Sequence, residues 1–189
     1  MRTRIKLDYN APLILTFVLL SGLSLAAGYL TNFESTELLF MTYRSSLGDP
    51  LTYVRFFGHV LGHAGWQHYI GNMSYILLLG PMLEEKYGAK RLLGVIALTA
   101  LITGLVNFFF FPHVAICGAS GVVFAFILMT SFTSFKKGEI PITFILVAIV
   151  YLGQQVYDGL FVKDNISNMA HIVGGIVGAV SGYMMRKKR

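Results

Sequence analysis

Long apolar runs, separated by short polar or charged stretches, make up most of this 189-residue chain. A helix needs roughly 20 predominantly apolar residues to cross the hydrocarbon core of a bilayer. By this criterion the pattern predicts six spans, at about 11–30, 66–85, 91–111, 118–135, 141–159 and 167–185. The sequence therefore predicts an all-α fold, a polytopic membrane helix bundle, in a single domain over residues 1–189.

The composition supports a membrane protein and excludes two other classes. Apolar residues make up 55% of the chain and charged residues 13%, whereas a typical soluble domain carries roughly 25% charge. A disordered chain is excluded, because disorder needs low hydrophobicity and high charge. An ordinary water-soluble globule could not keep this much apolar surface away from water.

The basic residues predict the orientation of the spans. Most Lys and Arg residues lie in four clusters between apolar runs, at 2–6, 86–91, 136–137 and 186–189. Clusters of this kind mark cytoplasmic segments, and one topology with both termini in the cytoplasm accommodates all four. Residues 1–10 are then a cytoplasmic tail, and the aromatic-rich segment 31–65 is an outer loop at the membrane interface.

The positions of the charges also predict the partners of this protein. A net charge of +6 concentrated in these clusters reflects membrane orientation, so we expect the lipid bilayer and no nucleic acid as a partner.

The second predicted span ends with two acidic residues. Glu84 and Glu85 lie beside Lys86 at the cytoplasmic edge, where we expect them to close the helix and to form interfacial ion pairs.

Residues 1–30 also have features of a secretory signal peptide, with a basic start and the small pair Ser24 and Ala26. The apolar stretch is longer than the usual roughly 7–15 residues, which favours a retained first span. Cleavage would leave five spans with the mature N-terminus outside, and this alternative stays open.

Polar and ionisable side chains inside spans are costly in lipid and are therefore candidates for function. They are His68 and Asn72 in the second span, Ser120 in the fourth, and Asn168 and His171 in the sixth. All lie in the first two turns of even-numbered spans, which begin on the outer side. The pattern predicts one polar cluster in the outer half of the membrane.

Ser120 stands within Gly118-Ala119-Ser120-Gly121, at the predicted start of a helix. Small neighbours leave its hydroxyl open to a reacting carbonyl, and the free N–H groups of a helix N-terminus favour an oxyanion there. The same tetrapeptide also fits a small-residue packing motif with an incidental serine. Taken alone, it leaves both interpretations open.

His171 precedes a G-x-x-x-G face, formed by Gly174 and Gly178, that allows close helix packing. If the fourth span packs on this face, a neutral imidazole can take the Ser120 proton as general base. A buried histidine with a backbone partner is the alternative.

His68 and Asn72 are four residues apart and share one helix face, where both can donate hydrogen bonds. Together with the Ser120 N–H they form a candidate oxyanion hole, with an interhelical polar clamp as the alternative. His59 and His63 have the i, i+4 spacing of helical zinc ligands, but no carboxylate joins the polar cluster and H-E-x-x-H is absent. We expect His59 and His63 to anchor the loop near the site, and we expect no metal and no cofactor.

Taken together, these motifs resemble the rhomboid intramembrane serine proteases. The matching pieces are, in order, His68-x-x-x-Asn72, Glu84-x-x-x-Gly88, Gly118-Ala119-Ser120-Gly121 and Ala170-His171-x-x-Gly174-x-x-x-Gly178. Val54 stands where the family often has a tryptophan before the residue equivalent to Arg55. Phe124 replaces a tyrosine of many members, and we expect its ring still to stack on His171.

The resemblance implies a protease that cleaves single-span membrane proteins in the outer half of the bilayer. It implies Ser120 as nucleophile, His171 as general base, and His68, Asn72 and the Ser120 amide as oxyanion stabilisers. The residues expected to shape or support the cavity are Gly118, Gly121, Phe124, Asn168 and Gly174. The family also implies a mobile cap around residues 160–166 and a lateral gate at the fifth span.

Two other functions stay open. A rhomboid-fold protein without peptidase activity would bind or dislocate membrane clients, although intact Ser120 and His171 argue against it. The other is an unrelated small transporter or metal-binding membrane protein. The predicted spans lack the paired acidic residues that proton-coupled carriers often use, which argues against a transporter. A compact core with short tails favours the plasma membrane of a prokaryote.

Overall fold

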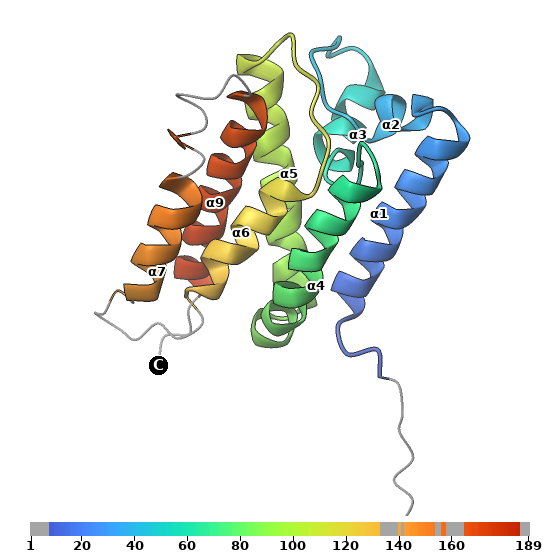
Figure 1. Cartoon of the computed structure of the whole chain (residues 1–189). Coiled ribbons are helices and arrows are strands. Elements are labelled where there is room, and N and C mark those ends of the chain that lie inside the picture. Colours follow the sequence, from blue (N-terminus) through green and yellow to red (C-terminus); the bar gives the residue numbers. More distant parts are fainter. Residues whose placement is uncertain (1–7, 133–139, 141, 154–155, 158–164, 186–189) are drawn as a thin grey trace, which may run out of the picture.

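The computed structural model describes residues 8–132, 140, 142–153, 156–157 and 165–185, and this part of the chain is helical without a named strand. Figure 1 shows the long helices standing side by side, with two short helices at one end of the bundle. The all-α prediction is therefore confirmed for the described residues. In chain order the elements are α1 (Pro12–Leu30), α2 (Glu34–Leu39), α3 (Pro50–Gly58), α4 (Trp66–Tyr87), α5 (Ala89–Phe110), α6 (Ser120–Thr130), α7 (Ile142–Val147), the π-helix η1 (Ala148–Leu152) and α9 (Asn165–Met185).

Length and hydropathy confirm only part of the predicted set of spans. Among the described helices, α1 and α5 combine the length of a membrane-crossing helix with a mean hydropathy of 2.1 and 2.2. Helices α4 and α9 have 22 and 21 residues but carry more polar side chains. The count of six spans is thus not confirmed. The basic clusters at 2–6, 136–137 and 186–189 lie outside the described residues.

The predicted span over 118–135 was too long. Helix α6 ends at Thr130, and its 11 residues rise only about 16 Å at 1.5 Å per residue. A helix of this length covers only about half of a hydrocarbon core about 30 Å thick, so a pass through the membrane here also needs the non-helical segment before α6. Residues 111–119 descend from the end of α5 to the start of α6 (Figure 1), so the first residue of α6, Ser120, lies inside the bundle.

Helix α6 is the centre of the core. Its residues from Gly121 to Val123 and from Ala125 to Met129 are all buried, as expected for a helix that is apolar on every face. Helix α9 packs on it most extensively. A Cβ atom added at Gly174 would overlap the Gly121 carbonyl, and one added at Gly178 would overlap the Ala125 carbonyl. The predicted G-x-x-x-G packing face is thus confirmed, with α6 as its partner.

Residues 31–65, predicted as an outer interfacial loop and named the outer segment here for that prediction, contain the short helices α2 and α3. Arg55 holds this segment together from a buried position, with 4% of its surface exposed. Its Nε donates to the Leu38 carbonyl at 2.9 Å, and its Nη1 donates to the Asp49 carboxylate at 3.2 Å. The guanidinium also covers the ring of Tyr43, 4.8 Å from the ring centroid.

Helix α1 is fastened to the bundle through Glu84 of α4. The two carboxylate oxygens accept the backbone N–H groups of Leu13 and Ile14, each at 3.0 Å. These N–H groups belong to the first turn of α1, where a helix leaves its donors unsatisfied. Glu84 is buried near the end of α4 and caps a neighbouring helix, a role that the interfacial ion pair expected for it did not include.

Candidate active site

A cavity of about 610 Å³ lies where α4, α5, α6 and α9 meet the segment 111–119. Four of the five polar residues predicted to cluster line it: His68, Asn72, Ser120 and His171. Asn168 is buried on α9, three residues before His171, but is not part of the lining. The other lining residues are Met41, His59, Val60, Ala64, Thr103, Val114, Ala115, Ile116, Cys117, Gly118, Gly121 and Ala170.

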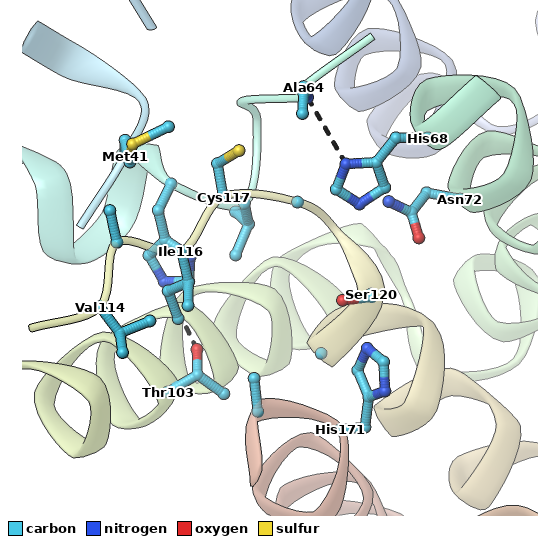
Figure 2. Close-up of a pocket in the computed structure, with 16 residues that line it drawn as sticks. Met41, Ala64, His68, Asn72, Thr103, Val114, Ile116, Cys117, Ser120 and His171 are labelled. Carbon is cyan, nitrogen blue, oxygen red and sulfur yellow. Dashed lines mark hydrogen bonds between the residues drawn. The ribbon is translucent and has the colours of Figure 1, made fainter. Parts of the chain in front are cut away.

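Ser120 and His171 reach the cavity from two different helices. Ser120 is the first residue of α6, and His171 lies in the second turn of α9. Figure 2 shows the serine side chain between the imidazole of His171 on one side and the amide of Asn72 on the other. The close packing of α6 on α9 brings the hydroxyl and the imidazole to the same cavity.

The ring of Phe124 lies flat against the ring of His171. The two centroids are 4.4 Å apart and the planes differ by 5°. Phe124 follows Ser120 by one helical turn, so a residue of α6 supports the imidazole that faces the first residue of α6. The expected stack is confirmed, and it needs no hydroxyl on the aromatic ring.

His68 and Asn72 occupy successive turns near the start of α4 and face the cavity together (Figure 2). Asn72 is 8% exposed, and its Nδ2 has no hydrogen-bond partner among the described residues. A buried amide donor without a partner costs free energy, which a ligand oxygen in the cavity would recover. Asn72 therefore supplies an unused donor directed at the cavity.

The two predicted glycines near Ser120 have different surroundings. Gly118 has φ of +130°, and a Cβ atom there would lie 2.7 Å from both Cε1 and Nε2 of His68. At Gly121 a Cβ atom would lie 3.4 Å from the Ala170 carbonyl and from Cγ2 of Thr103, which is ordinary van der Waals contact. A larger residue would therefore displace His68 at position 118, whereas position 121 accepts a Cβ atom.

The segment 111–119, which leads to Ser120, is held by the outer segment. Thr42 and Ile116 form an antiparallel bridge, with N–H···O distances of 2.9 and 3.0 Å in the two directions. The Gly118 N–H donates to the His59 carbonyl at 2.8 Å. The backbone contacts of Thr42 and His59 thus help to position Ser120, the first residue of α6.

His59 also anchors the outer segment on α5. Its Nε2 lies 3.0 Å from the Ala100 carbonyl, and a carbonyl can only accept, so Nε2 carries the proton. Burial lowers the pKa of His59 to about 4, although the bond to Ala100 opposes this shift. The imidazole is therefore neutral near pH 7 and acts as a hydrogen-bond donor.

Sequence reasoning missed a polar row on α5. Thr99, Thr103 and Asn107 are buried and spaced four residues apart, which places them on one helix face. Thr103 lines the cavity, and the Asn107 amide donates to the carbonyls of Thr42 at 3.3 Å and Val114 at 3.0 Å. The four-residue spacing of polar residues within an apolar span was the available signal.

Three further predictions concern the thiol of Cys117, metal binding and the cap. Cys117 lines the cavity, and burial raises the pKa of its thiol to about 11, so the thiol stays protonated near pH 7. No group of three His, Cys, Asp or Glu residues within the described ranges could hold a metal ion. The cap expected around 160–166 falls on residues whose structure is not described.

The described helices expose many large apolar side chains, as membrane helices do, and four of the predicted polar residues line the cavity between them. The model of the Rhomboid domain family matches residues 50–188, which is most of the chain. The chain belongs to the rhomboid family.

Individual relatives agree with the family match. The chain is 33% identical to rhomboid-related protein 2 of Mus musculus over 159 residues, covering 72% of this chain and 52% of the mouse protein. It is 29% identical to rhomboid protease GlpG of Haemophilus influenzae over 161 residues, covering 83% of this chain and 82% of GlpG. The chain thus spans about half the length of the mouse relative and most of the bacterial one.

Proposed function

We propose that this protein is an intramembrane serine endopeptidase that hydrolyses peptide bonds of transmembrane substrates in the outer half of the bilayer. The observation that carries the proposal is the shared cavity, which both Ser120 of α6 and a ring-stacked His171 of α9 line. A hydroxyl next to an imidazole is the pair that covalent acyl transfer needs. Membership of a family with a named protease, GlpG, supports the same reaction class.

In the proposed mechanism, Ser120 attacks the scissile carbonyl while His171 accepts the hydroxyl proton. His171 then gives this proton to the leaving amine, and the C–N bond of the tetrahedral intermediate breaks. A water molecule hydrolyses the acyl-enzyme with the same imidazole as base. Phe124 keeps the imidazole plane fixed, so both proton transfers use one ring orientation.

The negative charge on the tetrahedral oxygen needs donors that are already in place. Nδ2 of Asn72 is the strongest candidate, because it is buried, faces the cavity and has no partner among the described residues. Nε2 of His68 and the backbone N–H of Ser120 complete the proposed oxyanion hole. Loss of one donor of this kind commonly costs roughly 10²–10³ in rate.

The substrate class follows from the position of the cavity. A spanning helix hides its peptide bonds in intrahelical hydrogen bonds, so the substrate must unwind locally before a carbonyl reaches Ser120. A cavity of about 610 Å³ has room for an extended peptide segment and for the hydrolytic water. We therefore expect single-span substrates with helix-breaking residues and a small residue at the cleavage point.

The arrangement in the membrane is part of the proposal. Six spans with both termini in the cytoplasm place the start of α6 in the outer half of the bilayer, and a plasma membrane location fits this topology. Residues 1–10 then form a cytoplasmic tail, and residues 31–65 lie at the outer interface.

The proposal is tested by replacing Ser120 with alanine in the full chain, purified in detergent micelles. Wild-type protein is expected to react with a serine-directed fluorophosphonate and to cleave a single-span substrate. Ser120→Ala is expected to lose the label and at least about 10⁴-fold in cleavage rate. Labelled peptide mapping identifies the modified serine.

Ser74→Ala is the matched control, because Ser74 is exposed on α4 and its hydroxyl bonds only the Ile70 carbonyl among the described groups. It should be labelled and should cleave like the wild type. A Ser120→Ala protein that cleaves as fast as wild type would refute the protease mechanism. Binding of membrane clients without any cleavage would instead support the inactive rhomboid-fold alternative.

A further inference from the structure

The ring of His68 is half-buried and has three close neighbours that the proposed mechanism does not use. On one side the backbone of Gly118 approaches so closely that no Cβ atom fits between them. On the opposite edge the backbone N–H of Ala64 points at Nδ1 of His68, at 3.5 Å (Figure 2). The third neighbour is the ring of His63, whose centroid is 5.1 Å from that of His68, with an angle of 67° between the planes.

The Ala64 contact selects one tautomer of His68. A backbone N–H can only donate, so Nδ1 of His68 is the acceptor and carries no proton in this arrangement. A neutral imidazole carries its single proton on the other nitrogen, here Nε2. Nε2 is also the nitrogen beside Gly118, two residues before Ser120. The N–H is therefore on the side of the ring that faces the cavity.

His63 is itself fixed and uncharged. Its Nδ1 lies 3.2 Å from the Leu61 carbonyl, which can only accept, so Nδ1 carries the proton and Nε2 has the free lone pair. Burial, with a smaller contribution from the charge of His68, lowers the pKa of His63 to about 4. The ring is fully buried and also contacts Tyr69 edge-on, 5.5 Å between centroids. The His63 ring is therefore a neutral, buried group that packs against the ring of His68.

We infer that the Ala64 amide and the ring of His63 are a positioning device that holds His68 in its Nε2–H tautomer, with this N–H directed at the oxyanion position. The inference rests on the proposed function, because it concerns the same reaction. Neither Ala64 nor His63 touches the reacting atoms; they act through the orientation and protonation of His68. The sequence favoured His59 and His63 as loop anchors near the site over zinc ligands, and the contacts of His63 support this more specific role.

The first experiment reads the tautomer directly and needs no catalysis. Full-length protein labelled with ¹⁵N-histidine is studied in detergent micelles near neutral pH, and the His68 signals are assigned by their loss in His68→Gln. We expect the Nε2 signal of His68 to be of the protonated type and the Nδ1 signal of the unprotonated, hydrogen-bond-accepting type. A His68 ring protonated at Nδ1 would overturn the inference.

The second experiment compares two substitutions of His63. His63→Ala removes the ring and is expected to lower kcat by about tenfold with little change in KM, less than the roughly 10²–10³-fold cost of losing a donor outright. His63→Phe keeps a flat ring of similar size and is expected to restore most of kcat. In His63→Ala the ¹⁵N spectrum should show a mixture of His68 tautomers, which a purely structural role would not produce.

The two proposals can fail separately. Absence of cleavage and of fluorophosphonate labelling by the wild type would end the proposed function, while the ¹⁵N spectrum would still test the tautomer. Cleavage by the wild type combined with unchanged kcat in His63→Ala would overturn only the positioning role. Equal losses in His63→Phe and His63→Ala would overturn it as well, because ring packing would then not be the relevant feature.

Discussion

At the scale of single residues, Phe124 is expected to control the reaction through His171. The two rings lie parallel at 4.4 Å, and such a contact contributes about 0.5–1.5 kcal/mol. We expect Phe124→Ala to lower kcat/KM by about 2–10-fold, because the imidazole then samples orientations that do not face Ser120. Cleavage of a single-span substrate in micelles measures this effect.

Phe124→Tyr is the matched variant, since it keeps the ring and adds one hydroxyl. Its kcat/KM should stay within a factor of about two of the wild type, because the stack involves only the ring faces. An equal loss in both variants would show that the size of the pocket around Phe124, and not the stack, determines the rate.

The polar residues within spans were predictable as a cluster, because polar side chains are costly in lipid and therefore face the interior of the bundle. His68, Asn72, Ser120 and His171 do line one cavity. Asn107 was not predicted to matter, because its amide donates to two backbone carbonyls, one nearby at Val114 and one far along the chain at Thr42. A hydrophobic pattern does not show which loop backbone a helical side chain will contact.

At the scale of helices, the close contact of α9 with α6 limits which residues can replace Gly178. We expect Gly178→Ala to destabilise the protein by about 1–3 kcal/mol, because the added Cβ atom would overlap the Ala125 backbone and force the helices apart. Since His171 is carried by α9, cleavage should fall as well. Thermal unfolding in micelles, followed by circular dichroism, measures the loss of stability.

Gly94→Ala on α5 is the control for this substitution. Nothing lies within 4 Å of the added Cβ atom at Gly94, so only helix propensity changes, by up to about 1 kcal/mol in favour of alanine. A Gly178→Ala protein as stable as Gly94→Ala would contradict the close contact between α6 and α9.

The end of α6 was misplaced although the sequence carries a signal for it. The continuous apolar run ends at Met129, and four of the next six residues are threonine or serine. Extending the span to residue 135 added this mixed stretch, because a full span needs roughly 20 residues. The start was recognisable, because Gly118 and Gly121 form a small-residue motif around Ser120.

At the scale of the whole molecule, Glu84 joins the first helix to the rest of the bundle. We expect Glu84→Ala to destabilise the protein strongly, by about 1–3 kcal/mol for each of the two N–H groups of α1 left without an acceptor. Glu84→Gln keeps one carbonyl acceptor and should lose less. Thermal unfolding in micelles gives both values.

Glu85 provides the comparison, because it is the next residue on α4 but is exposed. Glu85→Ala should change stability by no more than about 0.5 kcal/mol. Equal effects of the two alanine substitutions would contradict the capping role. The sequence placed both glutamates at one helix end, but only the fold shows that the start of α1 lies against just one of them.

The buried histidines of the outer segment make the stability of the whole molecule depend on pH. Burial lowers the folded-state pKa values of His59 and His63 to about 4, from 6.5 in the unfolded chain. Between these values the unfolded state binds more protons, so stability is complete above about pH 6.5 and is lost progressively as pH falls towards 4. We expect the unfolding temperature to decrease between about pH 7 and pH 5, above the main titration range of exposed carboxylates.

His59→Gln separates this effect from other titrations. A glutamine amide can donate to the Ala100 carbonyl as Nε2 of His59 does, but it does not titrate in this range. The variant should therefore lose less stability than the wild type on acidification, even if it begins slightly less stable at pH 7. Because the His59 carbonyl holds Gly118, the loss of cleavage at low pH should follow the loss of structure in the outer segment. Parallel pH dependences of unfolding in the two proteins would show that His59 is not a source of the acid sensitivity.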